Sequence, residues 1–424
     1  MERWSSRTAF ILASVGSAVG IGNIWRFSSV VGQNGGGAYL VPYLIAVFAF
    51  ALPLMMLELA VGRRLRGDVV TAFGRASHRF RPLGWVVCAV VFSILSYYLV
   101  VTGWTLAYVG FSIAGEGVEF ADFTSTYSPI GYFIISALVM GAIVSLGIKD
   151  GIERATKLLI PFSFLLLLGL AAFSSTLEGF GAGWRYLFTP DFSVLADPLL
   201  WAAAFGQAFF SLSVGYGILL TYGDYLDEGI GILNSSLIIT FADLAVAILA
   251  GLVIFPVVFT YGLEPAAGAE LAFSTLPRAF EVMPYGSAFA VAFFALLFSA
   301  AMTSAVSMLE VSAASVAAAT GFSRRRVSFA LTAGTIALGL PSALSYSSAA
   351  LEVGGVRVLD IMDETVGGLG LVLTATLIAV TFTWFMDGKA LAEEMGRGRR
   401  LALPIAKYAV PAVMAMTLLA RVLL

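Results

Sequence analysis

The sequence has very few of the residues on which most catalytic and metal centres depend. Its 424 residues include one cysteine, Cys88, and one histidine, His78. A single cysteine excludes an internal disulfide and a cysteine-based metal site. A single histidine, placed in an arginine-rich loop, argues against a Ser-His-Asp triad or a histidine-ligated metal. We therefore expect a protein that is not an enzyme and that has no organic cofactor.

Charged residues are also scarce. They make up 12% of the chain, whereas soluble domains carry about 25%. The 24 Lys and Arg residues nearly balance the 26 Asp and Glu residues, for a net charge of -2, and hydrophobic residues reach 59%. The composition excludes a soluble globular protein and a disordered one, and the charge gives no basis for nucleic-acid binding. It predicts a protein that crosses the lipid bilayer many times.

Long apolar runs define the expected fold, because a span needs ~20 mostly apolar residues. We expect an all-α integral membrane protein, since only helices or closed barrels satisfy the backbone in lipid. The N-terminus lacks a cleavage site, so we expect no signal peptide, and residues 1–424 are expected to form a single domain. The eleven predicted transmembrane helices are 8–33, 37–61, 83–113, 129–147, 156–176, 198–222, 230–261, 285–319, 327–344, 359–386 and 402–423.

Basic residues are concentrated in alternate loops. One set of loops contains most of them, and the opposite set has only Arg185, Arg278 and Arg357 among many acids. Positive charge is enriched in cytoplasmic loops, so the N-terminus is predicted to be cytoplasmic and, with an odd number of spans, the C-terminus outside. The basic set is Arg63, Arg64, Arg66, Arg75, Arg79, Arg81, Lys149, Arg154, Lys157, Arg324, Arg325, Arg326, Lys389, Arg397, Arg399 and Arg400.

Two spans contain glycine at mid-membrane. The first reads SVGSAVGIGNIWRF and the sixth AFGQAFFSLSVGYGILL. Small residues in membrane helices often serve close packing, but two clusters, each beside polar groups, favour discontinuous helices. Such pairs are typical of transporters built from inverted repeats. We expect a first repeat over 8–176, a second over 198–386 and an additional helix at 402–423.

Five motifs resemble those of the neurotransmitter:sodium symporter family, in its prokaryotic amino-acid branch, which has the leucine-transporter fold. They are SAVGIGNIWRF, NGGGAYLVPY, SYYLVVTGW, GQAFFSLSVGYG and AMTSAVS. The resemblance covers essentially the whole chain. It implies a sodium-coupled secondary active symporter of a neutral amino acid, working by alternating access in the cell membrane as a monomer or weak homodimer.

The resemblance also implies a substrate site. The substrate carboxylate would contact the amides of Ile21 and Gly22 and the Tyr98 hydroxyl, and the amino group would contact carbonyls of Ala18, Phe210 and Ser211. Gly20 stands where monoamine members carry an Asp, which favours an amino acid with its own carboxylate. The side-chain pocket would be formed by Ser17, Ile94, Phe210, Ser213, Tyr216, Ala305 and Met308. This lining favours, within the neutral amino acids, aromatic or bulky aliphatic substrates.

Two sodium sites are implied in the same way, both made of hard oxygen ligands. The first would use Ala18, Asn23, Ser211 and Asp243 together with the substrate carboxylate. The second would use carbonyls of Gly16, Val19 and Ala300 and the hydroxyls of Thr303 and Ser304. A Thr-Ser pair in a membrane helix more often bonds its own backbone, and only the AMTSA motif indicates a sodium site here.

Asp243 departs from the family pattern, which more often has Asn at this position. A charge at mid-span is costly and functional by default. Chloride-dependent members place a Ser one turn later, where this chain has Ala247, although Tyr43, Gln207 and Ser211 of that anion site are present. We expect the Asp243 carboxylate to supply the negative charge that chloride supplies elsewhere, so that transport is independent of chloride.

The external gate of the family has matching residues in this chain, but the cytoplasmic gate does not. Arg26 and Asp363 match the external gate pair of the family. The usual cytoplasmic pair is missing, because its positions align with Met1 and Ala318; Arg3 and Asp224 are weak candidates to replace it. Gly151 and Pro161 resemble the place where the fifth helix unwinds in this family. The loop from Tyr261 to Gly286 is either a lid that folds back or an amphipathic surface loop.

Three other functions are compatible with parts of this pattern. A proton-coupled transporter of the same fold would use Asp243 or Glu58 as the proton carrier. An amino-acid sensor would bind substrate without transporting it. A membrane protease or prenyltransferase would need a triad or two acidic clusters, and DYLDE at 224–228 has no second cluster opposite it.

Overall fold

The structure, a computed structural model, describes residues 2–190, 192–263 and 271–423, and these form a bundle of helices. The α-helices are α1 Arg7–Ala18, α2 Phe27–Gln33, α3 Leu40–Ile45, α4 Leu52–Leu65, α5 Val69–Ala76, α6 Arg81–Ala114, α7 Phe120–Thr124, α8 Ser128–Ser145, α9 Arg154–Ser174, α10 Phe180–Phe188, α11 Pro198–Ser211, α12 Ile218–Asp224, α13 Ile232–Thr260, α14 Leu276–Val282, α15 Gly286–Thr320, α16 Arg324–Ser345, α17 Val358–Met362, α18 Leu371–Trp384, α19 Gly388–Met395, α20 Arg399–Pro404 and α21 Val410–Leu423.

Shorter elements connect or extend these helices. The strands β1 Glu352–Val353 and β2 Val356–Arg357 pair antiparallel as a small hairpin. The π-helical segments are η1 Gly22–Arg26, η3 Ala46–Ala51, η5 Ile148–Glu153, η7 Leu271–Thr275, η8 Asp363–Gly370 and η10 Ile405–Ala409. The 3-10 segments are η2 Gly36–Ala38, η4 His78–Phe80, η6 Phe192–Ala196 and η9 Gly396–Gly398.

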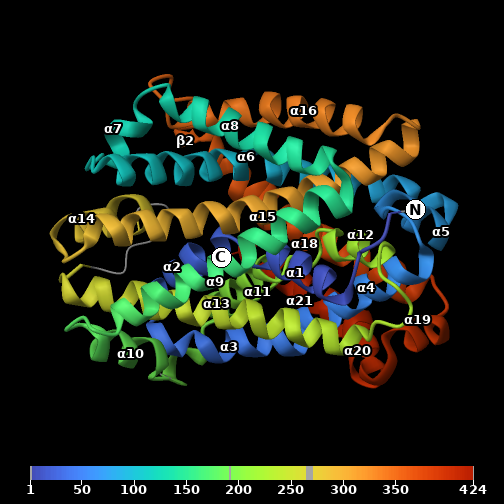
Figure 1. The fold of residues 1–424 in the computed structure, drawn as a ribbon. Helices are drawn as coiled ribbons and strands as arrows, with labels where there is room; N and C mark the ends of the chain where they lie inside the picture. The colour runs from blue at the N-terminus through green and yellow to red at the C-terminus, as the bar shows by residue number, and fades with distance from the viewer. Residues whose placement is uncertain (1, 191, 264–270, 424) are drawn as a thin grey trace.

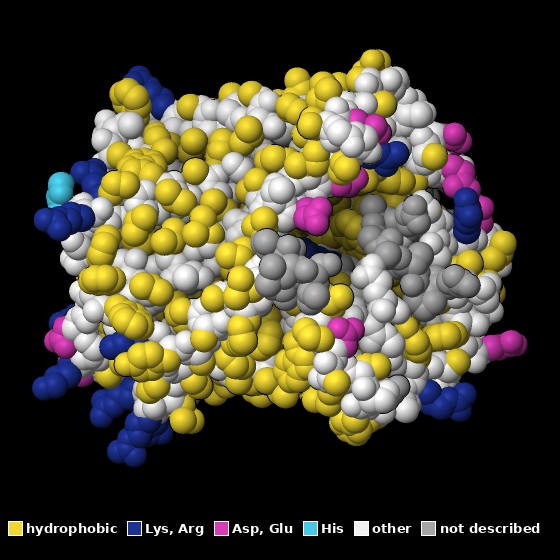
Figure 2. Space-filling model, turned by 180° about the vertical axis from the view of Figure 1, so that it is seen from behind, with side chains coloured by type: hydrophobic (Ala, Val, Ile, Leu, Met, Phe, Trp, Pro, Cys, Tyr) yellow, Lys and Arg dark blue, Asp and Glu magenta, His cyan; other side chains and the backbone are white. Residues whose placement is uncertain are grey.

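The long helices run side by side along one axis (Figure 1). The N-terminus, α5 and α19 lie at one end of the bundle, which we call the N-terminal end, and α7, α10 and α14 lie at the opposite end. Lys, Arg and the histidine gather at the N-terminal end in the space-filling view, acids are more frequent at the opposite end, and hydrophobic side chains cover the sides between them (Figure 2). This distribution fits a protein whose sides contact lipid and whose two ends contact water.

Nine helical stretches of the described residues are long and apolar enough to span a membrane, and ten if a bent pair counts as one span. Burial separates inner from outer helices. In their most apolar windows, 78% of the helix over Gly286–Thr320 is buried, against 28% of that over Ile148–Ser174. The former, α15, therefore lies in the centre of the bundle, and the latter faces outward. The predicted span at 198–222 is not among the ten, because α11 and α12 are each too short by themselves.

The first helix is interrupted at mid-bundle. It ends at Ala18, Val19 adopts an extended conformation, and helical geometry resumes at Gly22 after a bend of 54°. The chain is interrupted again between α11, which ends at Ser211, and α12, which begins at Ile218. Both interruptions fall where the sequence clusters glycine and serine, residues that tolerate non-helical geometry.

The segment over 261–286 folds back onto the bundle as far as it is described; residues 264–270 lie outside the described part. Leu271, Ala272 and Phe273 of η7 are each 1% exposed. The Phe273 ring packs edge-on against Trp25, with a centroid distance of 6.1 Å, and against Trp104 at 5.8 Å. The described part of this segment is thus a packed cover, as one of the two sequence-based interpretations has it, rather than a surface loop.

Close packing of α4 against α12 gives a test of the core. A methyl group at Gly223 would lie 2.7 Å from the Leu59 carbonyl oxygen and 3.1 Å from its Cα. We expect Gly223→Ala to destabilise the protein by about 1–3 kcal/mol, because the rigid backbone of α4 has to move away. The measurement is the free energy of unfolding in detergent.

The matched control for Gly223→Ala is Gly131→Ala in α8, where nothing lies within 4 Å of the added methyl group. Alanine favours helix by about 1 kcal/mol over glycine, so this control should be neutral or stabilising. Equal effects of the two substitutions would show that the contact between α4 and α12 is not tight.

Candidate functional site

The interruption of the first helix leaves backbone groups that its own turns do not satisfy, and side chains from other elements bond them. The Gly20 amide donates to Asn23 Oδ1 at 3.0 Å, and the Ile21 amide donates to the Tyr98 hydroxyl oxygen at 3.4 Å. Tyr98 comes from α6, a long, uninterrupted helix of the bundle. Side chains of η1 and α6 thus take the place of the missing helix turn.

The second interruption, between α11 and α12, is bonded in the same way. Ser213 has a φ of 52°, in the left-handed region, and its hydroxyl donates to the Ser17 carbonyl at 2.7 Å. The Gly215 amide donates to Glu58 Oε1 at 2.6 Å. Gln207 donates to the Gly22 carbonyl at 2.9 Å. The two interruptions therefore lie against each other and hold each other in place.

A cavity of about 20 Å³ lies between the two interruptions. Every predicted substrate residue except Ile21 and Ala305 contributes to its wall. The walls are formed by Ser17, Ala18, Gly20, Gly22, Asn23, Ile94, Tyr98, Phe210, Ser211, Ser213, Tyr216, Ile218, Ser304 and Met308. Ile21 lines the next cavity outward, and Ala305 is fully buried beside Ser304. This volume holds about one water molecule, so the side chains around it have to move apart to admit a larger ligand.

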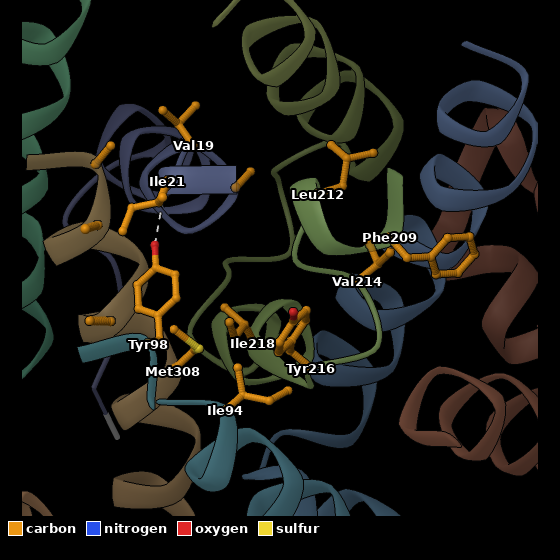
Figure 3. Close-up of a cluster of buried hydrophobic side chains, with 14 of the residues drawn as sticks. Val19, Ile21, Ile94, Tyr98, Phe209, Leu212, Val214, Tyr216, Ile218 and Met308 are labelled. Atoms are coloured by element: carbon orange, nitrogen blue, oxygen red, sulfur yellow. Dashed lines mark hydrogen bonds between the residues drawn. The ribbon is translucent and has the colours of Figure 1, made fainter. Parts of the chain in front are cut away.

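The cavity has a polar side and an apolar side. Figure 3 shows Tyr98 directed at Ile21, with the hydrogen bond drawn, while Met308, Ile94, Ile218 and Tyr216 gather on the other side. Ile218 was not among the predicted residues. It begins α12 directly after Gly217, so a search one residue beyond the second glycine cluster would have found it. No charged side chain lines the apolar side.

The residues predicted for the first sodium site form one buried network. Asn23 Nδ2 donates to Ser211 Oγ at 2.8 Å and to Asp243 Oδ1 at 2.5 Å. Ser211 Oγ donates to the Asp243 carboxylate, at 2.9 Å to one oxygen and 3.0 Å to the other. Asp243 is fully buried, and a buried carboxylate requires such partners or a cation. Ala18 completes the predicted set on the wall of the same cavity.

The residues predicted for the second sodium site also lie together. The Ser304 hydroxyl lies 3.4 Å from the Gly16 carbonyl oxygen and 3.5 Å from that of Val19. Thr303 donates to the Ala300 carbonyl at 3.0 Å within α15. A methyl group at Gly16 would lie 3.2 Å from Thr303 Cβ, closer than an ordinary contact, so glycine favours this approach of α1 to α15.

These oxygens suit an alkali cation rather than a transition metal. The described residues contain no group of three or more His, Cys, Asp or Glu side chains that could hold a metal ion. The second set has neutral oxygens only, and the first has a single carboxylate. Hard, weakly charged oxygen sites of this kind favour ions such as sodium over transition metals, which prefer imidazole and thiolate ligands.

A second cavity, of about 280 Å³, lies outward of the first and shares Gly22, Tyr98 and Phe210 with it. Arg26 and Asp363 both line it but form no ion pair with each other. The Arg26 guanidinium lies over the Phe210 ring, 4.6 Å from its centroid, and Asp363 accepts a hydrogen bond of 3.0 Å from Tyr97. Tyr97, which sequence reasoning missed, is thus the partner of Asp363 here.

The opposite side of the site, toward the N-terminal end, is tightly packed. The proposed replacement of the cytoplasmic gate by Arg3 and Asp224 was wrong about the partner: Arg3 pairs with Asp227, at 2.7 Å. The loop after α12 brings Asp227 rather than Asp224 toward the N-terminal segment. Gly151 falls in the π-helical segment η5 and Pro161 inside α9, which runs unbroken from Arg154 to Ser174, so unwinding of the fifth helix stays a prediction.

Comparison with known proteins shows which family this chain is similar to. The model of the sodium:neurotransmitter symporter family matches residues 1–129 and 126–422. A sodium-dependent transporter of Methanocaldococcus jannaschii is 33% identical over 430 residues, which cover 95% of this chain and 86% of the relative. The mouse sodium-dependent neutral amino acid transporter B(0)AT2 is 30% identical over 292 residues, 60% of this chain and 40% of that protein.

A solved structure is similar over nearly its full length. The crystal structure of MhsT in complex with L-phenylalanine matches with a TM-score of 0.91 and 35% sequence identity. The match covers 99% of this chain and 99% of that one. The arrangement of helices around the two interruptions is therefore shared with a transporter whose bound ligand is an amino acid.

The buried network of Asn23 and Asp243 gives a prediction about stability without ligand. Asn23→Ala removes a donor from a buried carboxylate, so it should cost about 1–3 kcal/mol of unfolding free energy. In the Asp243→Ala background, Asn23→Ala should lower the unfolding free energy much less, because there is no buried carboxylate that loses its donor. A double-mutant cycle measured by unfolding in sodium-free detergent tests this coupling.

Thr335→Ala serves as the control for this cycle. Thr335 is equally buried, but its hydroxyl bonds only the Leu331 carbonyl of its own helix. Its effect should be small and the same with or without Asp243→Ala. Additive costs for Asn23→Ala and Asp243→Ala would contradict the network.

Proposed function

Because the chain belongs to the sodium:neurotransmitter symporter family, whose members are sodium-coupled membrane transporters and not enzymes, we propose that it is a sodium-coupled symporter of a neutral amino acid. Its preferred substrates are aromatic or bulky aliphatic. Transport proceeds by alternating access, in which the central cavity opens first to one side of the membrane and then to the other.

The membrane arrangement follows from the helices and charges. We propose eleven spans, of which the sixth consists of α11 and α12 with the interruption at residues 212–217 between them. Residues 8–176 and 198–386 form two inverted repeats, so each repeat begins with an interrupted helix, and 402–423 is an added span. The basic N-terminal end is cytoplasmic, in the cell membrane, and the C-terminus is outside. The basic charge at the N-terminal end in Figure 2 supports this orientation.

One observation carries the proposal: hydrogen-bond donors suited to a carboxylate lie directly beside oxygen ligands suited to a cation. The Ile21 amide lies 3.4 Å from the Tyr98 hydroxyl, which lines the cavity, and Asn23 and Ser211, which bond each other and Asp243, line the same cavity. A substrate carboxylate bound at Ile21, Gly22 and Tyr98 would lie within reach of a sodium ion at Ala18, Asn23, Ser211 and Asp243.

This adjacency explains how sodium would drive uptake. When a substrate carboxylate and a sodium ion bind side by side, each raises the affinity for the other by the same factor. The second sodium, at Gly16, Val19, Ala300, Thr303 and Ser304, would join α1 to α15. The inward sodium gradient could then drive accumulation of the amino acid, because neither ligand binds as tightly without the other.

The apolar side of the cavity supports the choice of substrate. Ile94, Ile218 and Met308 offer aliphatic surface, and Phe210 and Tyr216 offer aromatic rings with a centroid distance of 6.3 Å. An unpaired charged side chain would be costly in this environment. The presence of L-phenylalanine in the MhsT complex and the neutral amino acids in the name of the mouse relative point the same way.

Chloride independence is proposed from the buried Asp243. Its carboxylate is a fixed negative charge beside the proposed first sodium, and Gln207 and Tyr43 surround the same region. Ala247, one turn further along α13, is fully buried and offers no hydroxyl to an anion. A chloride ion here would lie beside the Asp243 carboxylate, and the repulsion between the two negative charges is electrostatically unfavourable.

The first test of this function is stabilisation by ligands. We expect phenylalanine, tryptophan or leucine to raise the melting temperature of the purified protein in sodium but not in potassium, because binding to the folded state alone stabilises it. Glutamate and lysine should have no effect. A thermal scan of each amino acid in both salts measures this.

Flux into proteoliposomes separates the alternatives. Uptake of the stabilising amino acid should require an inward sodium gradient. Uptake driven by a pH gradient at zero sodium would establish the proton-coupled alternative, with Asp243 or Glu58 as carrier, and sodium-dependent stabilisation without any uptake would establish a sensor.

A second test concerns the anion. Uptake by the unmodified protein should be equally fast in chloride and gluconate. Asp243→Asn with Ala247→Ser removes the fixed charge and adds a hydroxyl, so its uptake in chloride should exceed that in gluconate by about tenfold, a difference of ~1.4 kcal/mol in anion-linked binding. Ala247→Ser alone, which keeps the carboxylate, should remain independent of chloride; strong chloride dependence of the unmodified protein would refute the proposal.

A further inference from the structure

Four residues form a charged cluster at the N-terminal end of the bundle, the Arg324 cluster, made of Glu2, Tyr225, Glu310 and Arg324. Arg324 pairs with Glu2 at 3.0 Å through one guanidinium nitrogen and with Glu310 through another. Its third nitrogen, Nε, donates to the Val144 carbonyl at 2.9 Å. Tyr225 donates to the second oxygen of Glu310 at 2.8 Å. One arginine therefore joins the N-terminal segment, α8, α15 and α16.

The two carboxylates differ greatly in burial. The Glu310 side chain is fully buried, Arg324 is 21% exposed and Glu2 is 43% exposed. Removal of one partner from a buried pair leaves an uncompensated charge, which is far more costly than loss of a surface pair. Glu310 thus holds Arg324 at this position permanently, whereas the pair with Glu2 can separate into water at a small cost.

Glu2 belongs to a segment that covers the inner end of α1. Its carboxylate also accepts the Ile148 amide at 3.1 Å. Trp4 donates from its ring to the Tyr222 carbonyl at 3.1 Å and packs edge-on against Tyr222 and Tyr225. Ser5 donates twice to Glu153, at 2.6 Å each. This segment is continuous with α1, so α1 cannot move away from α9 and α15 until these contacts separate.

We propose that Arg324, through Glu2, is the positioning residue that keeps the cytoplasmic side of the central site closed in this chain, and that separation of the Arg324–Glu2 pair allows α1 to move and open that side. Here α16 supplies the cation, Arg324, and the N-terminal segment supplies the carboxylate, Glu2. This is the reverse of a pair in which the N-terminal segment supplies the cation. This proposal rests on the function proposed above for its orientation in the membrane, but the contacts themselves do not depend on transport.

The planar guanidinium is necessary for this role. It presents several N–H donors in a fixed geometry, which here serve two carboxylates and a carbonyl at once. A lysine has the same charge but a single nitrogen, and it cannot reach all three oxygens. Arg324→Lys should therefore keep the pair with Glu310 and lose part of the control exerted through Glu2.

The test measures access from the two sides of the site with single cysteines, in the full-length protein with Cys88→Ser. Thr156→Cys reports the inner side. Thr156 is 1% exposed and lies in the first turn of α9, directly after Glu153 of η5, which is bonded to Ser5. Ile160, one turn further along α9, lies close to Gly16. Val101→Cys reports the outer side, because Val101 lines the outer cavity. Labelling rates with a membrane-impermeant maleimide are measured on purified protein without amino acid.

We expect Arg324→Gln to raise the labelling rate at Thr156→Cys and to lower that at Val101→Cys, each by about tenfold, because a shift toward one open state depletes the other. Glu2→Gln should change both rates in the same directions by a smaller factor, and should have little further effect once Arg324→Gln is present. Arg324→Lys should lie between Arg324→Gln and the unmodified protein.

Two variants guard against simple misfolding. Arg325→Gln changes the adjacent, exposed arginine and should leave both rates unchanged. Arg324→Gln with Glu310→Gln removes the buried carboxylate that Arg324→Gln leaves unpaired, so it should restore thermal stability while the inner side stays accessible. Equal increases at both reporters, or no change at either, would overturn the proposal. A protein that shows the reciprocal shift but neither binds nor transports an amino acid would instead contradict the proposed function.

Discussion

In a bundle surrounded by lipid, every backbone N–H and C=O must find its partner within the protein, and the two interruptions exist only where side chains meet this requirement. Asn23 and Tyr98 accept the amides of Gly20 and Ile21, Gln207 and Ser213 donate to the carbonyls of Gly22 and Ser17, and Glu58 accepts the Gly215 amide. Ser213 and Gln207 join the two interruptions directly, while α4 and α6 supply Glu58 and Tyr98. The central cavity is the space between the two interruptions.

The same requirement gives the site its ability to bind. Backbone groups that are bonded by side chains rather than by helix turns can exchange those partners for a ligand without unfolding a helix. The Tyr98 hydroxyl accepts the Ile21 amide over 3.4 Å, a long hydrogen bond, and Ser304 lies between 3.2 and 3.5 Å from three carbonyls. Weak internal bonds at these points cost little to replace, so a carboxylate and a cation would gain stronger contacts there than the protein loses.

Much of this could be predicted from the sequence, because glycine and serine at mid-span and a lone Asp243 in an apolar helix are local signals that conflict with an ordinary span. Some side-chain partners that lie far apart in the sequence could not be predicted. Asp363 accepts a hydrogen bond from Tyr97, which the sequence analysis did not name, and Arg3 pairs with Asp227 rather than Asp224. The Arg324–Glu2 contact joins residues 322 positions apart. Nothing in either neighbourhood indicates the other, since a surface arginine in a basic loop is the usual orientation signal. Ile218 was missed for a different reason: an isoleucine after a glycine cluster looks like any lipid-facing residue.

The two ends of the site are unequal in a way that indicates its conformational state. Outward, a cavity of about 280 Å³ separates Arg26 and Asp363, whose side chains bond Phe210 and Tyr97 instead of each other. Inward, Trp4, Ser5 and Glu2 are all bonded to helices that surround α1. Closing the outer side would bring an arginine toward an aspartate at little desolvation cost, because both are already partly in water. Opening the inner side would leave Glu310 with Arg324, but it would separate Glu2 from Arg324 and Ile148, Trp4 from Tyr222, and Ser5 from Glu153. The charge pairs that change between the two states are therefore the exposed ones, Arg26 with Asp363 and Glu2 with Arg324, while the buried pair of Glu310 and Arg324 persists. In the transport proposed above, this keeps the electrostatic cost of the change small.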